Sequence, residues 1–297
     1  MILQKYLAVF ILLYGVLFGI LECAKAYRDR SALTEERGSF WKMSLAEGIV
    51  YFLSTMGFPD FVMNTLIFQK TSWVPEEKIP PSLVAVTVTP GAVIAFSYLR
   101  SNSQTGSLTL ILCMIAIAAG SFTGAHLVIS LSGELIRKLL TLAMLFSMAA
   151  LIVKMIVSAG STGTATDLTA GQLCIVIPVV FCFGFINMFG VPMKPAATAL
   201  FLLMGLSPMT TLTLMLAMGF MSPMAGGIQV LKSGKYHKKL SVASVVSGTL
   251  GAVLGTFVTV SLNAMVLNII LLCIMGFTVM TLGRNQGAKK NRRYGEK

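Results

Sequence analysis

One apolar pattern occurs twice in this chain, and this repetition constrains the fold more than any other feature. The segment GFPDFVMNTLIF begins at Gly57, and the segment GVPMKPAATALF begins at Gly190, 133 residues later. Further along, GSFTG at 120–124 corresponds to GAVLG at 251–255, at nearly the same spacing. A duplicated apolar bundle with a Gly-x-Pro break in each half is typical of secondary transporters.

The composition places this pattern in a lipid bilayer. The 297 residues are 56% hydrophobic and only 11% charged, whereas a soluble domain carries roughly 25% charged residues. Such an apolar excess must be covered by lipid, so we predict an all-α polytopic membrane protein. The net charge of +12 does not indicate nucleic-acid binding, because the basic residues lie mainly between or after the apolar segments, where cytoplasmic loops collect them.

The apolar segments predict an extra N-terminal helix and two repeated four-helix halves, each with one broken helix. The predicted spans are 2–21, then 45–70, 81–99, 107–131 and 135–157, then 172–206, 208–231, 240–262 and 264–282. The corresponding units are an N-terminal helix with a loop (1–44), transport repeat 1 (45–158), a linker (159–171), transport repeat 2 (172–283) and a basic tail (284–297).

The basic segments predict the orientation. The stretch 22–44, the loop 232–239 and the tail 284–297 are rich in Lys and Arg, so we expect all three in the cytoplasm of a cell-membrane protein. An even number of spans per half then gives both halves the same direction. One alternative stays open, since the segment 172–206 is long enough to cross, break and partly return.

Each Gly-x-Pro break is a predicted substrate site. Pro59 and Pro192 lack a backbone N–H and clash with the preceding turn, so each helix ends and restarts there. Within hydrocarbon, such a break is tolerated only where it faces protein or a water-filled cavity. We expect the N–H groups of residues 60–62 and 193–194 to point out of the breaks and to attract an anion. The alternative is a pair of ordinary proline kinks.

Lys194 is the strongest single candidate, because it lies two positions past Pro192 in an otherwise uncharged segment. A charge at that depth costs a few kcal/mol and marks a functional residue. Three interpretations stay open: Lys194 binds the anion, it forms a structural pair with Asp60, or it reaches water at an interface.

Neutral polar residues near the breaks could add hydrogen bonds or simply join helices. With them, the predicted substrate-binding residues are Gly57, Pro59, Asp60, Asn64, Thr65, Asn187, Gly190, Pro192, Lys194 and Thr198. By contrast, the glycine pairs 120/124 and 251/255 are predicted to serve close helix packing. Glu47 is interpreted as a charge at a helix start or at the membrane interface.

No sequence motif predicts catalysis. The five cysteines form no C-x-x-C pair and have no histidine nearby in sequence, so no metal site or other cofactor is predicted. The chain has no P-loop and no motif of a membrane protease or lipase. We therefore predict a protein that is not an enzyme and that works without hydrolysing ATP.

The order of these features resembles the TauE/SafE sulfite exporter family. The resemblance rests on the duplicated four-helix unit with a glycine before a proline, the GLSPMT step at 205–210, the basic loop and the following G-x-x-x-G helix, over about residues 45–282. It implies transport of sulfite, organosulfonates or related small sulfur or carboxylate anions. The chain departs from the family at TMGFPDF, where many members have a run of glycines.

The sequence thus predicts a secondary transporter, or permease, for a small anion. Its expected partners are that substrate and the lipid bilayer, and both proton coupling through Asp60 and a homo-oligomer are compatible with the sequence. Two alternatives stay open. One is a carrier of a cation or a neutral metabolite centred on Asp60, and the other is a membrane anchor subunit that transports nothing.

Overall fold

The structure is a computed structural model that describes residues 2–101, 105–130 and 163–261, with the single positions 135, 149, 153, 156 and 157. These residues are almost entirely helical, and the one β feature among them is an isolated bridge between Ala165 and Leu206. The predicted span 264–282 and the tail 284–297 lie outside the described residues, as does most of the predicted span 135–157.

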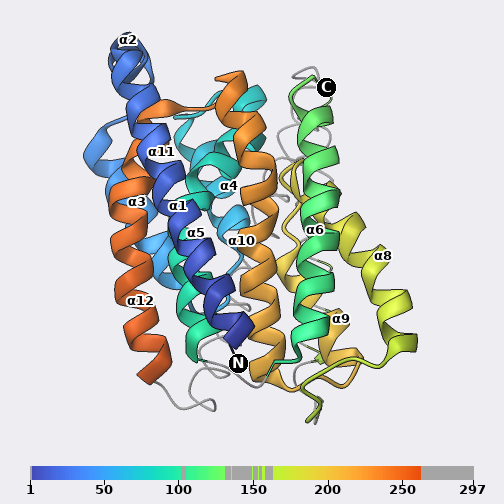
Figure 1. Cartoon of the computed structure of the whole chain (residues 1–297). Helices are drawn as coiled ribbons and strands as arrows, with labels where there is room; N and C mark the ends of the chain where they lie inside the picture. Colours follow the sequence, from blue (N-terminus) through green and yellow to red (C-terminus); the bar gives the residue numbers. More distant parts are fainter. Residues whose placement is uncertain are drawn as a thin grey trace.

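The described residues form a bundle of long and short helices (Figure 1). The helices are α1 (Ile2–Arg28), α2 (Arg30–Glu35), α3 (Phe40–Ser54), α4 (Asp60–Thr71), α5 (Ile79–Ser101), α6 (Ser107–Val128), α8 (Ala170–Asn187), α9 (Lys194–Leu203), α10 (Pro208–Ser233), α11 (Lys238–Ala243) and α12 (Thr249–Ser261). A 3₁₀ turn, η1 (Glu76–Lys78), precedes α5, and a π-helical turn, η2 (Ser244–Gly248), joins α11 to α12. Six of these helical stretches are long and apolar enough to cross a membrane, so the chain is a multi-pass helical membrane protein.

The N-terminal helix is longer than predicted. It continues to Arg28, and α3 already begins at Phe40, so the expected loop 22–44 is mostly helical. Glu22 accounts for part of the difference, because it is buried and its Oε1 accepts a 2.5 Å hydrogen bond from the Ser241 hydroxyl. Since α1 also packs along α5, it belongs to the bundle, and the boundary predicted after residue 44 falls inside α3.

The first broken segment, α3 and α4, is a hairpin that starts and ends on one side of the bundle. The chain turns at Gly57, whose φ of 90° is a conformation that glycine adopts without strain. Trp73, which follows α4, lines the same hollow as Glu36, which precedes α3. The segment 45–70 is therefore not the single crossing that the sequence predicted. We call this side the basic end, because it carries Arg37, Lys78, Lys235, Lys238 and Lys239.

The second broken segment, α8 and α9, is a hairpin that opens at the opposite end. The chain turns at Gly190, with a φ of 87°. The side-chain amide of Gln172, at the start of α8, donates a 3.0 Å hydrogen bond to the carbonyl of Met204, just past α9. The helix α6 begins beside this opening and ends at the basic end, beside Lys235. The segment 172–206 thus breaks and returns, which is the alternative that the sequence left open.

Because each hairpin returns to its own side, the helices of the two halves run in opposite directions. The helix α5 begins at the basic end, where the Ser82 hydroxyl accepts a 2.9 Å hydrogen bond from the His237 N–H. The helix α10 begins at the opposite end, where the Ser207 N–H donates to the Ala165 carbonyl at 2.8 Å. These two antiparallel helices pack against each other and are the most buried of the long helices. The prediction that both halves run in one direction is wrong, and the internal repeat itself stays a prediction.

Two outer helix pairs approach closely at glycines, as predicted. A Cβ on Gly120 of α6 would lie 2.0 Å from the Phe181 carbonyl oxygen of α8. A Cβ on Gly251 of α12 would lie 2.1 Å from the Gly48 carbonyl oxygen of α3. Figure 1 shows α3 and α12 along one edge of the bundle and α6 and α8 along the other. These contacts hold α3, the first helix of one hairpin, against α12, and α8, the first helix of the other hairpin, against α6.

Candidate functional site

The two hairpins meet inside the bundle through an ion pair. The Lys194 Nζ lies 2.6 Å from the Asp60 Oδ1, and both side chains are at least nine-tenths buried. Asp60 is the first residue of α4 and Lys194 is the first residue of α9. The second helix of each hairpin therefore begins with a charged residue. The two charges are opposite, and they face each other where the two halves of the chain meet. The structural pair, one of the three interpretations of Lys194, is present.

The ammonium group of Lys194 has a further partner and room around its stem. It donates a 2.9 Å hydrogen bond to the hydroxyl of Ser54, the last residue of α3. Gly219 of α10 faces the stem, since a Cβ there would lie 3.0 Å from the Lys194 Cε. The Lys194 side chain thus joins its own hairpin to the α3–α4 hairpin, which lies far away in the sequence, and contacts α10 as well.

A small hollow lies beside this pair, and five predicted site residues line it. Its lining is Pro59, Asp60, Phe61, Asn187, Pro192, Met193, Lys194 and Gly219. The amide nitrogen of Asn187 also donates a 2.7 Å hydrogen bond to the hydroxyl of Ser222 in α10, which in turn accepts a 2.8 Å hydrogen bond from Ser121 of α6. Asn187 is therefore held by α10, and through Ser222 it is linked to α6, while it borders the hollow.

The other predicted site residues take different places. Gly57 and Gly190 form the bends and do not line the hollow. The hydroxyl of Thr65 donates to the carbonyl of Phe61 within its own helix, and that of Thr198 donates to the carbonyl of Lys194. Asn64 points to Glu47 of α3, with its amide nitrogen 3.5 Å from a carboxylate oxygen.

Two of the backbone N–H groups that were expected to bind an anion already donate hydrogen bonds within the chain. The N–H of Asp60 donates to the Phe58 carbonyl at 3.0 Å, and the N–H of Val62 donates to the Pro59 carbonyl at 3.0 Å. The prediction that the N–H groups of residues 60–62 all point free is therefore wrong for these two. The positive charge of the site comes first from the Lys194 ammonium, with the helix starts as a smaller contribution.

Sequence reasoning missed several polar residues of this region. Ser54, Ser121 and Ser222 are buried and make the contacts described above. Glu47, interpreted as a residue at a helix start or interface, is fully buried. A usable signal was present, because residues 47, 51 and 54 follow helical spacing and lie on one face of α3.

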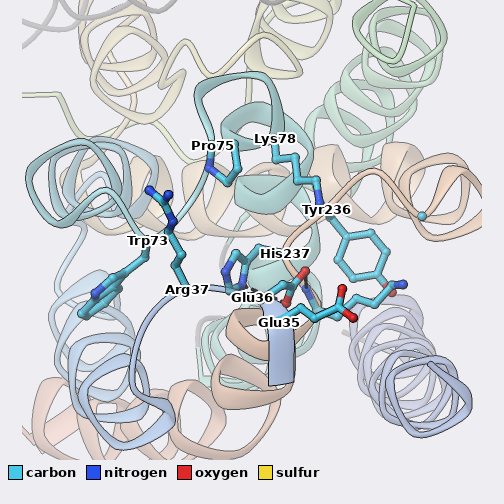
Figure 2. A pocket seen from close by; sticks show the side chains of 10 residues that line it. Glu35, Glu36, Arg37, Trp73, Pro75, Lys78, Tyr236 and His237 are labelled. Atoms are coloured by element: carbon cyan, nitrogen blue, oxygen red, sulfur yellow. Dashed lines mark hydrogen bonds and ion pairs between the residues drawn. The ribbon is translucent and has the colours of Figure 1, made fainter. Parts of the chain in front are cut away.

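A larger hollow of about 340 Å³ lies at the basic end (Figure 2). It is lined by Glu35, Glu36, Arg37, Trp73, Pro75, Lys78, Gly234, Tyr236, His237 and Lys238. The Glu36 carboxylate accepts hydrogen bonds from the N–H groups of Lys238 and Lys239 at 3.0 and 2.7 Å, so it stabilises the start of α11. The His237 Nδ1 lies 3.2 Å from the same carboxylate. These contacts tie the segment before α3 to the basic loop.

His237 predicts a pH dependence of stability. Burial lowers the pKa of His237 below its ordinary value of 6.5, and the Glu36 carboxylate opposes this shift. A lowered pKa in the folded state favours the neutral ring. The contribution of His237 to the free energy of unfolding is therefore complete above about pH 6.5 and is lost as the pH falls through the lowered pKa. We expect the unfolding temperature in detergent to drop on acidification, and this drop to shrink in His237→Gln. The exposed His126→Gln is the control and should keep it; equal drops in both variants would contradict the assignment.

The arrangement offers chemistry for binding a small anion. One buried ammonium is shared by a carboxylate and a hydroxyl at the meeting point of two chain breaks, which suits exchange of one anionic partner for another. No family model, curated protein or solved structure that was searched matches the chain.

Proposed function

We propose that the protein is a secondary transporter that moves a small anion, such as sulfite, an organosulfonate or a related sulfur or carboxylate anion, across the cell membrane. One observation carries the proposal: the Lys194 ammonium is buried where two hairpins from opposite ends of the bundle meet. A buried charge in a membrane protein is costly and is retained for function.

The chemistry of the pair favours an anion. Asp60 supplies a carboxylate 2.6 Å from the ammonium, so it occupies the position that a bound anion would take. A substrate anion that displaces Asp60 would gain the charge-assisted hydrogen bonds of Lys194. Protonation of Asp60 would weaken its hold on Lys194 and would link anion binding to the proton gradient.

The opposed directions of the two halves favour alternating access. Transporters with inverted repeats bind substrate at broken helices near the bilayer midplane and move one half against the other around that site. Here each half contributes one hairpin to the Lys194–Asp60 pair. The excess of Lys and Arg at the basic end supports a cytoplasmic position for that end. The resemblance to the TauE/SafE family supports the choice of sulfite and sulfonates.

Flux measurements with purified protein in liposomes test the proposal. We expect saturable sulfite uptake that a pH gradient stimulates, and loss of that stimulation in Asp60→Asn. Uptake of a cation or a neutral metabolite that survives Lys194→Ala but not Asp60→Asn would favour the alternative carrier. Absence of flux for sulfite, sulfonates and small carboxylates would overturn the proposal and would favour a membrane anchor.

A further inference from the structure

One face of α3 carries a continuous polar stripe through the apolar bundle. Ser44, Glu47, Tyr51 and Ser54 follow one another at spacings of three, four and three residues, so they lie on the same side of the helix. Their exposures are 6%, 0%, 0% and 0%. The stripe begins in the first turns of α3, near the basic end, and finishes at Ser54, which accepts the hydrogen bond of Lys194.

Glu47 is the ionisable centre of this stripe. Its Oε2 lies 3.5 Å from the amide nitrogen of Asn64, and its Oε1 is buried without a hydrogen-bond partner among the described residues. Asn64 lies one helical turn after Asp60 on α4. Asn64 thus connects Glu47 to the helix that carries the acidic member of the Lys194–Asp60 pair.

Among the residues that the structure describes, the groups around Glu47 include no cation that could neutralise it. The titratable groups that face it are Asp60 of α4 and Tyr51 of its own helix, and the Ser244 hydroxyl of η2 also faces it. On α11, the Lys238 ammonium pairs with Asp29, and Lys239 donates to the Glu36 carbonyl. The sequence of α12 is uncharged. An unpaired carboxylate in such surroundings is far more costly than the neutral acid.

We propose that Glu47 carries the coupling proton and passes it to Asp60. In the empty state Glu47 is a neutral acid and Asp60 is a carboxylate paired with Lys194. When an anion arrives, the proton leaves Glu47 for Asp60, and Glu47 takes a new proton from water of the basic end. Asp60 is then neutral, and Lys194 binds the anion. One proton enters with one monovalent anion, so the net charge of the site is the same before and after loading.

This inference rests on the proposed anion transport and predicts a split between two modes of flux. Net sulfite uptake requires Glu47 to load and release a proton in every cycle, whereas in exchange of internal for external sulfite Asp60 keeps its proton while one anion replaces the other at Lys194. We expect Glu47→Gln to lose the net uptake driven by a pH gradient and to keep sulfite exchange. Glu22→Gln is the matched control, because Glu22 is an equally buried acid on α1 that binds Ser241 instead of Asn64.

A second measurement needs no transport. The infrared spectrum of the purified protein should contain a carboxylic acid C=O band from protonated Glu47. This band should be lost in Glu47→Gln and retained at least in part in Glu22→Gln. If wild-type protein neither takes up nor exchanges sulfite, the proposed function fails, and this band alone decides for or against a buried proton on Glu47. Equal net uptake in Glu47→Gln and wild type, uptake driven by sodium instead of protons, or a spectrum unchanged by Glu47→Gln would each overturn the assignment.

Discussion

Replacing Lys194 by alanine is expected to abolish sulfite transport and to lower the free energy of unfolding by about 3 to 5 kcal/mol, the cost of removing one partner of a buried ion pair. The substitution leaves the Asp60 carboxylate buried without its cation and removes the hydrogen bond that the Ser54 hydroxyl accepts. Thermal unfolding in detergent, with uptake into liposomes, measures both effects.

A double variant separates stability from transport. In Lys194→Met with Asp60→Leu, neither charge remains buried and the apolar volume is retained, so most of the lost stability should return. Transport should not return, because the cation that attracts the anion is absent. A double variant that regains stability and also transports sulfite would show that the pair is purely structural.

Replacing Gly120 by alanine is expected to separate α6 from α8. The new Cβ would lie 2.0 Å from the Phe181 carbonyl oxygen, which is backbone and cannot move aside as a side chain can. Alanine favours a helix by about 1 kcal/mol over glycine, so any fall in the free energy of unfolding measures the clash between the two helices. We expect the free energy of unfolding, measured by denaturation in detergent, to fall by at least the ~1 to 3 kcal/mol that overpacking usually costs.

Gly171→Ala is the matched control for this change. Gly171 lies in α8, and a Cβ there meets nothing within 4 Å, so alanine should leave the unfolding temperature unchanged or raise it. If Gly120→Ala is as stable as Gly171→Ala, the close packing of α6 on α8 is contradicted.

The features of this site that depend on neighbouring residues could be predicted from the sequence. Glycine and proline interrupt helices for reasons that lie within a few residues, so the bends at Gly57 and Gly190 could be located. The pairing of Asp60 with Lys194 was one of three interpretations, because opposite charges at matching positions of an apolar chain have few other partners.

The direction of the arms after each break could not be read in this way. An arm of 12 residues such as α4 has the same composition whether it continues across the bilayer or returns, and only contacts such as Gln172 with Met204 distinguish the two. Glu47 was missed for a related reason, since its surroundings include Ser244 of η2, which is distant in sequence, as well as α4, whose return toward α3 could not be predicted. The length of α1 depended likewise on the hydrogen bond between Glu22 and Ser241.

The most direct test of the account is the exchange of labelled sulfite across sealed liposomes that contain either wild-type protein or the Lys194→Met, Asp60→Leu variant. The account predicts saturable exchange by wild type and none by the variant, although both proteins are folded. Exchange at equal rates by the two proteins would contradict an anion site built on Lys194.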